Sequence, residues 1–275
     1  MRVYLSVDME GLAGISHTAP TGREDAGYAE ACRLMEGEAN AAIAGAFDGG
    51  ASEVIVNDSH GPMFNLSPTA LDPRARLVQG RKALSMVEAA ADAAFDVALF
   101  VGYHARAGHP RGTIAHTYTG QPTLTTLGGR PTGEYGINGL YLGALGVPVG
   151  LVTGDDALAE EVADWLPWAE RVVVKHGRGY RAADSVHPSV ARDLVARAAR
   201  RAIERALAGE LQPLTLDAPI EVGIEFRHAG QADFAAVIPG FSRAGDRGVR
   251  YGASDGIDAY RAFVSAVRLA NIADE

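Results

Sequence analysis

The stretch VYLSVDMEG, residues 3–11, places a short apolar run directly before two carboxylates. Side chains of an extended chain alternate between two faces, so Asp8 and Glu10 project from the same face of the strand end. Two neighbouring carboxylates repel each other and disfavour joint ionisation unless a cation lies between them. The stretch therefore predicts a buried strand whose end needs a compensating positive charge, and a metal ion is one candidate for it.

Short β-branched runs alternate with longer helical patterns along the chain, which predicts an α/β fold with a mostly parallel sheet flanked by helices. The predicted strands are 3–7, 52–58, 75–80, 96–103, 122–129, 147–156 and 169–177. The predicted helices are 24–50, 83–95, 134–146 and 157–166. The pattern then changes to a long helix at 189–209, followed by the segments 219–226, 230–238 and 254–273. We therefore expect a metal-binding catalytic domain at 1–185 and a smaller α/β domain or subdomain at 186–275.

Composition excludes several classes of function. The chain has 275 residues, with 25 basic and 34 acidic residues and a net charge of −9, which argues against a nucleic-acid-binding protein. The single cysteine, Cys32, allows no intrachain disulfide and is expected to be a packing residue of a helix. The first apolar run ends at Asp8, and no stretch of about 18 apolar residues follows, so we expect no targeting or membrane segment and a cytoplasmic protein.

Metal-type side chains follow four of the predicted strands. Ligands of open α/β sheets bind beyond the carboxyl ends of the strands. The side chains in question are Asp8 and Glu10 after 3–7, Asn57, Asp58 and His60 after 52–58, His104 after 96–103, and Glu134 after 122–129. Because parallel strands bring their carboxyl ends to one edge of a sheet, we expect these side chains to lie together.

Each of these residues also has a simpler explanation. A glutamate at a helix start, such as Glu134, is often only a cap, NDSHG (57–61) is an ordinary turn sequence, and a histidine after a strand is usually a surface residue. As a set, two histidines and three carboxylates match the mixed ligands of zinc or a similar divalent ion. Five ligands with one shared carboxylate suffice for two metals about 3.5–4 Å apart.

Other polar residues are less specific. His116, twelve residues beyond His104, is a candidate proton donor or oxyanion-binding group, or simply a polar loop residue. The ammonium group of Lys175 either reaches the site, or the residue only packs the aliphatic part of its side chain. The remaining candidates are expected to be structural: His17, His109, His176, His187 and His228, and Asp155 and Asp156 as helix-capping residues.

The sequence resembles the zinc D-aminopeptidases over nearly its whole length. The resemblance rests on SVDMEG (6–11), VNDSHG (56–61), GYHARA (102–107), GEYGIN (133–138), TGDD (153–156) and IEFRHAGQADFAAVIPG (224–240). It implies a binuclear site with two Zn²⁺ per subunit and release of N-terminal D-amino acids from short peptides. It also implies a homodecamer, because that family forms rings of ten subunits. By resemblance the zinc ligands are Asp8, which bridges the two ions, with Glu10, His60, His104 and Glu134, and the catalytic histidine is His116.

The sequence therefore predicts a zinc aminopeptidase that removes the first residue, a D-amino acid, from peptides such as D-Ala-D-Ala. Metal-bound hydroxide is the expected nucleophile, so His116 is expected to stabilise the oxyanion or to protonate the leaving amine. The alternatives are a metal-dependent aminopeptidase or amidohydrolase acting on L-peptides or another small amide, a non-catalytic peptide-binding protein, and a structural ring protein with incidental metal.

Overall fold

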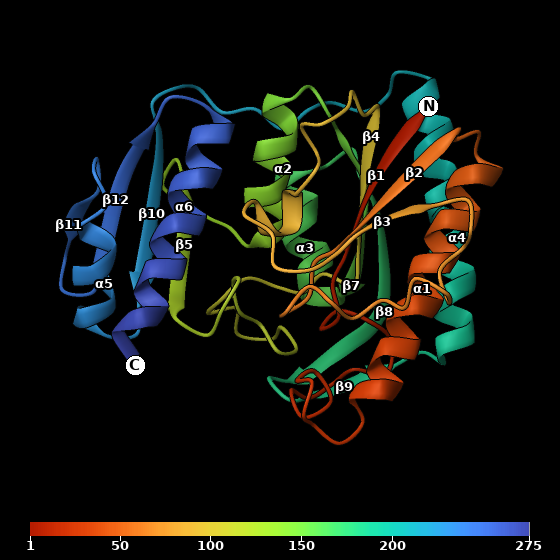
Figure 1. Cartoon of the computed structure of the whole chain (residues 1–275), viewed down its shortest axis with the longest axis horizontal. Coiled ribbons are helices and arrows are strands. Elements are labelled where there is room, and N and C mark those ends of the chain that lie inside the picture. Colours follow the sequence, from red (N-terminus) through yellow and green to blue (C-terminus); the bar gives the residue numbers. More distant parts are fainter. Residues whose placement is uncertain (275) are drawn as a thin grey trace.

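The apolar residues at the start of the chain form β1 (Arg2–Val7), a central strand of the larger of two sheets (Figure 1). The computed structural model describes residues 1–274. The other strands of the larger sheet are β2 (Glu53–Asp58), β3 (Arg76–Val78), β4 (Val97–Val101), β7 (Val149–Asp155), β8 (Glu170–Gly179) and β9 (Ala182–Ser185). The smaller sheet contains β5 (Pro122–Leu127), β6 (Arg130–Pro131), β10 (Ile220–Phe226), β11 (Ser242–Ala244) and β12 (Gly248–Ala253). The helices are α1 (Tyr28–Asp48), α2 (Glu134–Ala144), α3 (Asp156–Trp165), α4 (Pro188–Leu207), α5 (Ala229–Ala236) and α6 (Gly256–Asn271), with short 3₁₀ turns η1 (Ser85–Val87) and η2 (Ile272–Asp274).

The larger sheet has the strand order β3-β2-β1-β4-β7-β8-β9. Its neighbouring strands are parallel from β3 to β8, and only β9 runs antiparallel to its neighbour. Parallel neighbours need long crossover connections, and α1, α2 and α3 lie in the connections β1–β2, β4–β7 and β7–β8. The predicted fold class, a mostly parallel sheet flanked by helices, is confirmed.

Both faces of β1 are buried, which explains why its sequence is an apolar run and not a strict alternation. Val3, Leu5 and Val7 pack with residues of α1 and α4 on one face. Tyr4 points to the opposite face, where its side chain joins the core that includes α2 and α3. The larger sheet is therefore the middle layer of a helix–sheet–helix sandwich.

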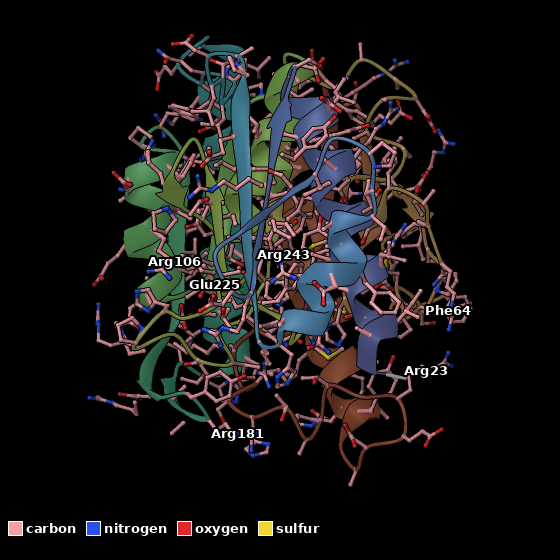
Figure 2. All side chains as sticks on the ribbon, turned by 90° about the vertical axis from the view of Figure 1, so that its left-hand side faces the viewer. Arg23, Phe64, Arg106, Arg181, Glu225 and Arg243 are labelled. Atoms are coloured by element: carbon pink, nitrogen blue, oxygen red, sulfur yellow. The ribbon has the colours of Figure 1, made fainter. Side chains whose placement is uncertain are left out.

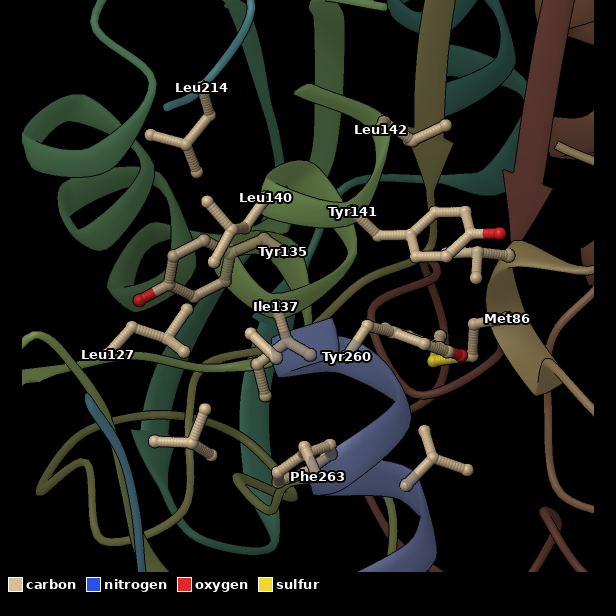
Figure 3. Close-up of a cluster of buried hydrophobic side chains, with 14 of the residues drawn as sticks. Met86, Leu127, Tyr135, Ile137, Leu140, Tyr141, Leu142, Leu214, Tyr260 and Phe263 are labelled. Carbon is tan, nitrogen blue, oxygen red and sulfur yellow. The ribbon is translucent and has the colours of Figure 1, made fainter. Parts of the chain in front are cut away.

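The smaller sheet has the order β11-β12-β10-β5-β6 and is antiparallel throughout. Helices α2 and α6 pack against each other between the two sheets. Figure 3 shows this contact, in which the ring of Tyr141 on α2 lies 5.0 Å from that of Tyr260 on α6, measured between ring centroids. The shared core fixes the smaller sheet beside the larger one.

The predicted helix at 83–95 is wrong. The segment contains only η1, followed by turns, and Ser85 and Ala89 have left-handed backbone angles (φ 50° and 64°). The hydroxyl of Tyr4 donates to the carbonyl oxygens of Met86 and Glu88, at 3.1 and 2.8 Å. These tertiary hydrogen bonds occupy carbonyls that a helix would use, so they override the local helical preference.

Two further differences concern the smaller sheet. The predicted strand at 122–129 exists as β5, but it lies in the antiparallel sheet, and β11 and β12 form between the predicted segments 230–238 and 254–273, where no element is predicted. The division of the chain into 1–185 and 186–275 stays a prediction. Any such division has to account for β5 and β6 in the smaller sheet and for α4, which packs against α1.

Within residues 1–274, none of the helices combines the length and the apolar character needed to cross a membrane. The cytoplasmic location stays a prediction.

Candidate metal centre

Three neighbouring strands bring four of the predicted site residues to one place. β2, β1 and β4 lie side by side and parallel, and Val7 pairs with both Asp58 and Val101 at their ends. Beyond these ends follow His60, then Asp8 and Glu10, then His104, in the same order of strands. The four side chains therefore meet at the carboxyl edge of the sheet, as expected from the strand pattern.

Glu134 reaches the same place by a different route. The expectation that a parallel strand would deliver it is wrong, because β5 belongs to the antiparallel sheet. Glu134 is the first residue of α2, and its Oε1 accepts a hydrogen bond of 2.6 Å from the backbone N–H of Tyr118. The helix N-terminus and this N–H both favour the ionised carboxylate.

His60 lies between two carboxylates. Its Nδ1 is 2.9 Å from Oε2 of Glu10 and 3.3 Å from Oδ1 of Asp8. Its Nε2 is 2.9 Å from the backbone carbonyl oxygen of Thr21, which can only accept, so Nε2 carries a proton. In a neutral His60 the Nδ1 lone pair therefore points toward the carboxylates.

His104 has the same arrangement with the roles of its two ring nitrogens exchanged. Its Nδ1 donates to the carbonyl oxygen of Ala105 at 3.0 Å, and its Nε2 lies 3.4 Å from Asp8 and 3.3 Å from Glu134. The side chain is buried, and its Nε2 has no hydrogen-bond partner within the described part of the chain. A neutral His104 thus presents an unsatisfied lone pair to carboxylate oxygens that also only accept.

Burial and mutual charge shift the ionisation of these groups. Burial raises the pKa of Asp8, and the charge of Glu10 raises it further. Burial also acts to raise the pKa of Glu10 and of Glu134, but His60 holds the first well below its usual range and His104 lowers the second. Burial acts to lower the pKa of both histidines, yet the Glu10 and Glu134 carboxylates raise them well above their ordinary value. The cluster therefore binds positive charge strongly, whether protons or metal ions supply it.

These residues fit divalent cations. Two sets of three side chains each place ligand atoms within 4.8 Å of one another: Asp8, Glu10 and His104, and His104, His116 and Glu134. Carboxylate oxygens and imidazole nitrogens are the ligands that zinc and similar ions take in proteins. A cation among them satisfies the lone pair of His104 and the carboxylates at once.

His116 lies against this cluster. Its ring stacks on that of His104, with centroids 4.0 Å apart and planes 9° from parallel. Its Nδ1 donates to the carbonyl oxygen of Ile114 at 2.8 Å, which leaves Nε2 as the reactive nitrogen. The side chain is half-buried. The position suits both a catalytic residue and, with His104 and Glu134, a metal ligand.

The other polar residues of the predicted strand ends have structural partners. Asp58 accepts hydrogen bonds from the backbone N–H groups of Asn65 and Leu66, and Asn57 accepts one from Lys82. The predicted cap at Asp155 is confirmed, because its Oδ1 accepts from the N–H of Leu158 at the start of α3. These residues hold loops around the cluster and do not join it.

Several residues that line the site are not indicated by any sequence pattern. The cluster opens into a cavity of about 100 Å³, and its walls include Met63, Ser85, Met86 and Tyr118. Met63, Ser85 and Tyr118 have left-handed φ angles of 58°, 50° and 63°. Such strained residues gather at functional sites. Tyr118 follows His116 by two positions, but no sequence pattern around it predicts its left-handed backbone angle.

A loop from before α1 covers one side of the site. Its Thr21 carbonyl accepts from His60, and the guanidinium of Arg23 lies 5.7 Å from the ring centre of Phe64. Figure 2 shows Arg23 and Phe64 next to each other at the margin of the molecule. The loops 18–27 and 61–65 therefore meet at the rim of the site.

Lys175 is neither exposed nor directed at the carboxylates. It is 1% exposed, and its Nζ donates to the carbonyl oxygens of Glu10, Leu12 and Ile15. Burial lowers its pKa to about 8. The lysine therefore fixes the loop that begins with Asp8 and Glu10.

An α/β protein that gathers carboxylates and histidines at the carboxyl edge of a parallel sheet has the organisation of a metal-dependent hydrolase. The particular family follows from comparison: the family model described as D-aminopeptidase matches residues 1–265, and the chain belongs to this family. The resemblance noted in the sequence motifs is thereby confirmed.

A similar sequence and a similar solved structure both come from Bacillus subtilis. The D-aminopeptidase of strain 168 is 37% identical over 273 residues, which cover 98% of each chain. The solved structure of the Zn-dependent D-aminopeptidase DppA, described as a self-compartmentalizing protease, matches with a TM-score of 0.91 and 36% identity over 98% of each chain. The agreement in fold is therefore as extensive as the agreement in sequence.

We predict that Lys175→Met destabilises both the fold and the metal centre. The substitution keeps the stem but removes the donors of three carbonyl groups, so we expect a loss of about 3 kcal/mol in unfolding free energy. Because the loop carries Asp8 and Glu10, we also expect about ten-fold weaker binding of Co²⁺ as a spectroscopic probe. Chemical denaturation and Co²⁺ titration measure the two effects. Unchanged Co²⁺ affinity in a destabilised protein would show that Lys175 supports only the fold.

Proposed function

We propose that the protein is a zinc-dependent D-aminopeptidase that binds two Zn²⁺ per chain and releases the N-terminal D-amino acid of short peptides such as D-Ala-D-Ala. One observation carries the proposal: three buried carboxylates surround imidazole nitrogens whose lone pairs face other acceptors. Family membership and the names of the matched sequence and the matched solved structure support the substrate class and the metal.

The ligands in this proposal are Asp8, Glu10, His60, His104 and Glu134, with Asp8 shared between the two ions. Asp8 is suited to sharing, because its Oδ1 faces His60 while its Oδ2 faces His104. Zinc bound there would polarise the scissile carbonyl and lower the pKa of water toward neutrality. The carbonyls of Thr21 and Ala105 hold the two histidines in the required tautomers.

In this proposal His116 acts as a hydrogen-bond or proton donor. Its Nδ1–H is committed to the carbonyl of Ile114, so a proton on Nε2 makes the ring cationic. In that form Nε2–H donates to the developing oxyanion or passes its proton to the leaving amine. The stacked ring of His104 keeps the His116 plane fixed.

The metal centre also offers a reason for cleavage at the first residue. We propose that the free N-terminal amine binds beside one of the metal positions or against a carboxylate oxygen, which a peptide bond further along the chain cannot do. The small cavity beside the cluster, about 100 Å³, leaves room for only a short side chain at that end.

We further propose a cytoplasmic homo-oligomer, with the ring of ten subunits as its specific form. The description of DppA as self-compartmentalizing supports assembly with copies of the same chain.

The proposed function predicts hydrolysis of D-Ala-D-Ala but not of L-Ala-L-Ala, and loss of that hydrolysis after chelation. The experiment follows alanine release from both peptides by zinc-loaded protein, by chelator-treated protein, and by treated protein to which Zn²⁺ is returned. Cleavage of the L-peptide would keep the metal chemistry and contradict the stereochemistry. Undiminished cleavage after complete zinc removal would contradict the metal requirement.

We predict that His116→Ala lowers kcat by about 10²–10⁴-fold, the usual range for a general acid or base, while zinc content stays that of the unmodified protein. Steady-state kinetics and elemental analysis of the same preparation measure the two quantities. His109→Ala, in the neighbouring loop, is the matched control and should change neither, since its Nδ1 only accepts from backbone N–H groups. Loss of zinc from His116→Ala would instead assign His116 as a ligand.

A further inference from the structure

A second and larger cavity adjoins the metal centre. It has a volume of about 600 Å³, within the range of about 300–1,000 Å³ that is usual for small-molecule sites. It shares Gly61, Met63, Ser85 and Tyr118 with the cavity of the metal centre. A molecule bound at the metal centre can therefore extend past these four residues into the larger cavity.

The two cavities are lined by different polar side chains. The metal centre contributes the carboxylates of Asp8, Glu10 and Glu134, which we propose as metal ligands, to its own cavity. The larger cavity is lined by Arg81, Lys82 and Arg268, and no acidic residue is among its lining residues in the described part of the chain. This basic surface stands out in a protein with a net charge of −9.

The three cations differ in what they already bind. The Nζ of Lys82 donates to the side-chain oxygen of Asn57 and the carbonyl of Asp58, at the end of β2. The guanidinium of Arg268, on α6, donates to the carbonyls of Lys82 and Ala83 at 2.7 Å each. These two residues therefore hold the loop that follows Arg81 in place.

Arg81 is the cation left for a ligand. Its side chain is exposed and has no hydrogen bond or ion pair with any residue from 1 to 274. The loop next to it is fixed by Arg268 and also by Tyr260, whose hydroxyl donates to the carbonyl of Leu84 at 2.6 Å. An arginine on an anchored loop matches a carboxylate through two parallel hydrogen bonds.

We propose that Arg81 recognises the C-terminal carboxylate of a short peptide whose N-terminal amine lies at the metal centre. This inference rests on the proposed function and names the substrate class more narrowly, as small zwitterionic peptides with a free carboxyl end. The apolar side chains of Val264 and Val267 on α6 line the same cavity and offer contact to the peptide's second side chain. The negative charge at the C-terminal end, and not a peptide bond alone, then selects the substrate.

The test compares D-Ala-D-Ala with its C-terminal amide, which removes only the negative charge. For the unmodified protein we expect a lower KM for the free acid than for the amide. Arg81→Ala should raise KM for the free acid about ten-fold, with kcat nearly unchanged, and leave the amide unaffected. Arg81→Lys should restore part of the difference. Arg197→Ala is the matched control, because Arg197 is also exposed but lies on α4, which packs against α1 on the larger sheet.

Calorimetric binding of both peptides to the same proteins, each also carrying His116→Ala to suppress turnover, separates this inference from the function. Hydrolysis of both peptides with no effect of Arg81→Ala, or with equal effects on both, would overturn the role of Arg81 and leave the function standing. Preferential binding of the free acid that depends on Arg81, without hydrolysis by the unmodified protein, would support the inference and overturn the function. Absence of binding and hydrolysis would overturn both.

Discussion

Mutual repulsion among Asp8, Glu10 and Glu134 is the constraint on which the site depends. Each of these carboxylates is at most 6% exposed, so water screens their charges poorly. Histidines reduce the repulsion, but His60 and His104 each direct their second ring nitrogen to a backbone carbonyl. Either protons on both rings, or metal cations between the carboxylates and the neutral rings, can then balance these charges. Two divalent ions supply that charge in the arrangement that we propose.

The rest of the fold holds these charges together. The loops that carry Asp8, His60 and His104 begin at the ends of three adjacent parallel strands, which fixes where these residues lie. The first turn of α2 adds Glu134 to the cluster. Lys175 secures the loop after β1 through three carbonyl groups. The left-handed backbone at the cavity walls is the kind of strain that a well-packed scaffold can sustain at a functional site. The stability of the surrounding core therefore offsets the backbone strain at the walls of the metal centre.

Residues of the site that follow from the order of strands could be predicted from the sequence, whereas those positioned by contacts between distant parts of the chain could not. The alternation of strands and helices predicted that Asp8, Glu10, His60 and His104 would meet, because neighbouring parallel strands end at one sheet edge. Glu134 was placed near the cluster for the wrong reason, since membership of β5 in one sheet or the other is decided by tertiary packing. The segment 83–95 was misassigned because Tyr4, far away in sequence, binds its carbonyls. The positions of Arg81, Tyr118 and Lys175 likewise depend on long-range contacts that no local pattern encodes.

The central claim is that the five side chains hold two zinc ions. Anomalous X-ray diffraction at the zinc absorption edge, on crystals of zinc-loaded protein, tests it most directly. We expect two anomalous peaks, both within bonding distance of Asp8, with the other four ligands, Glu10, His60, His104 and Glu134, distributed between them. A single peak, peaks at other side chains, or no zinc at this buried cluster would contradict it.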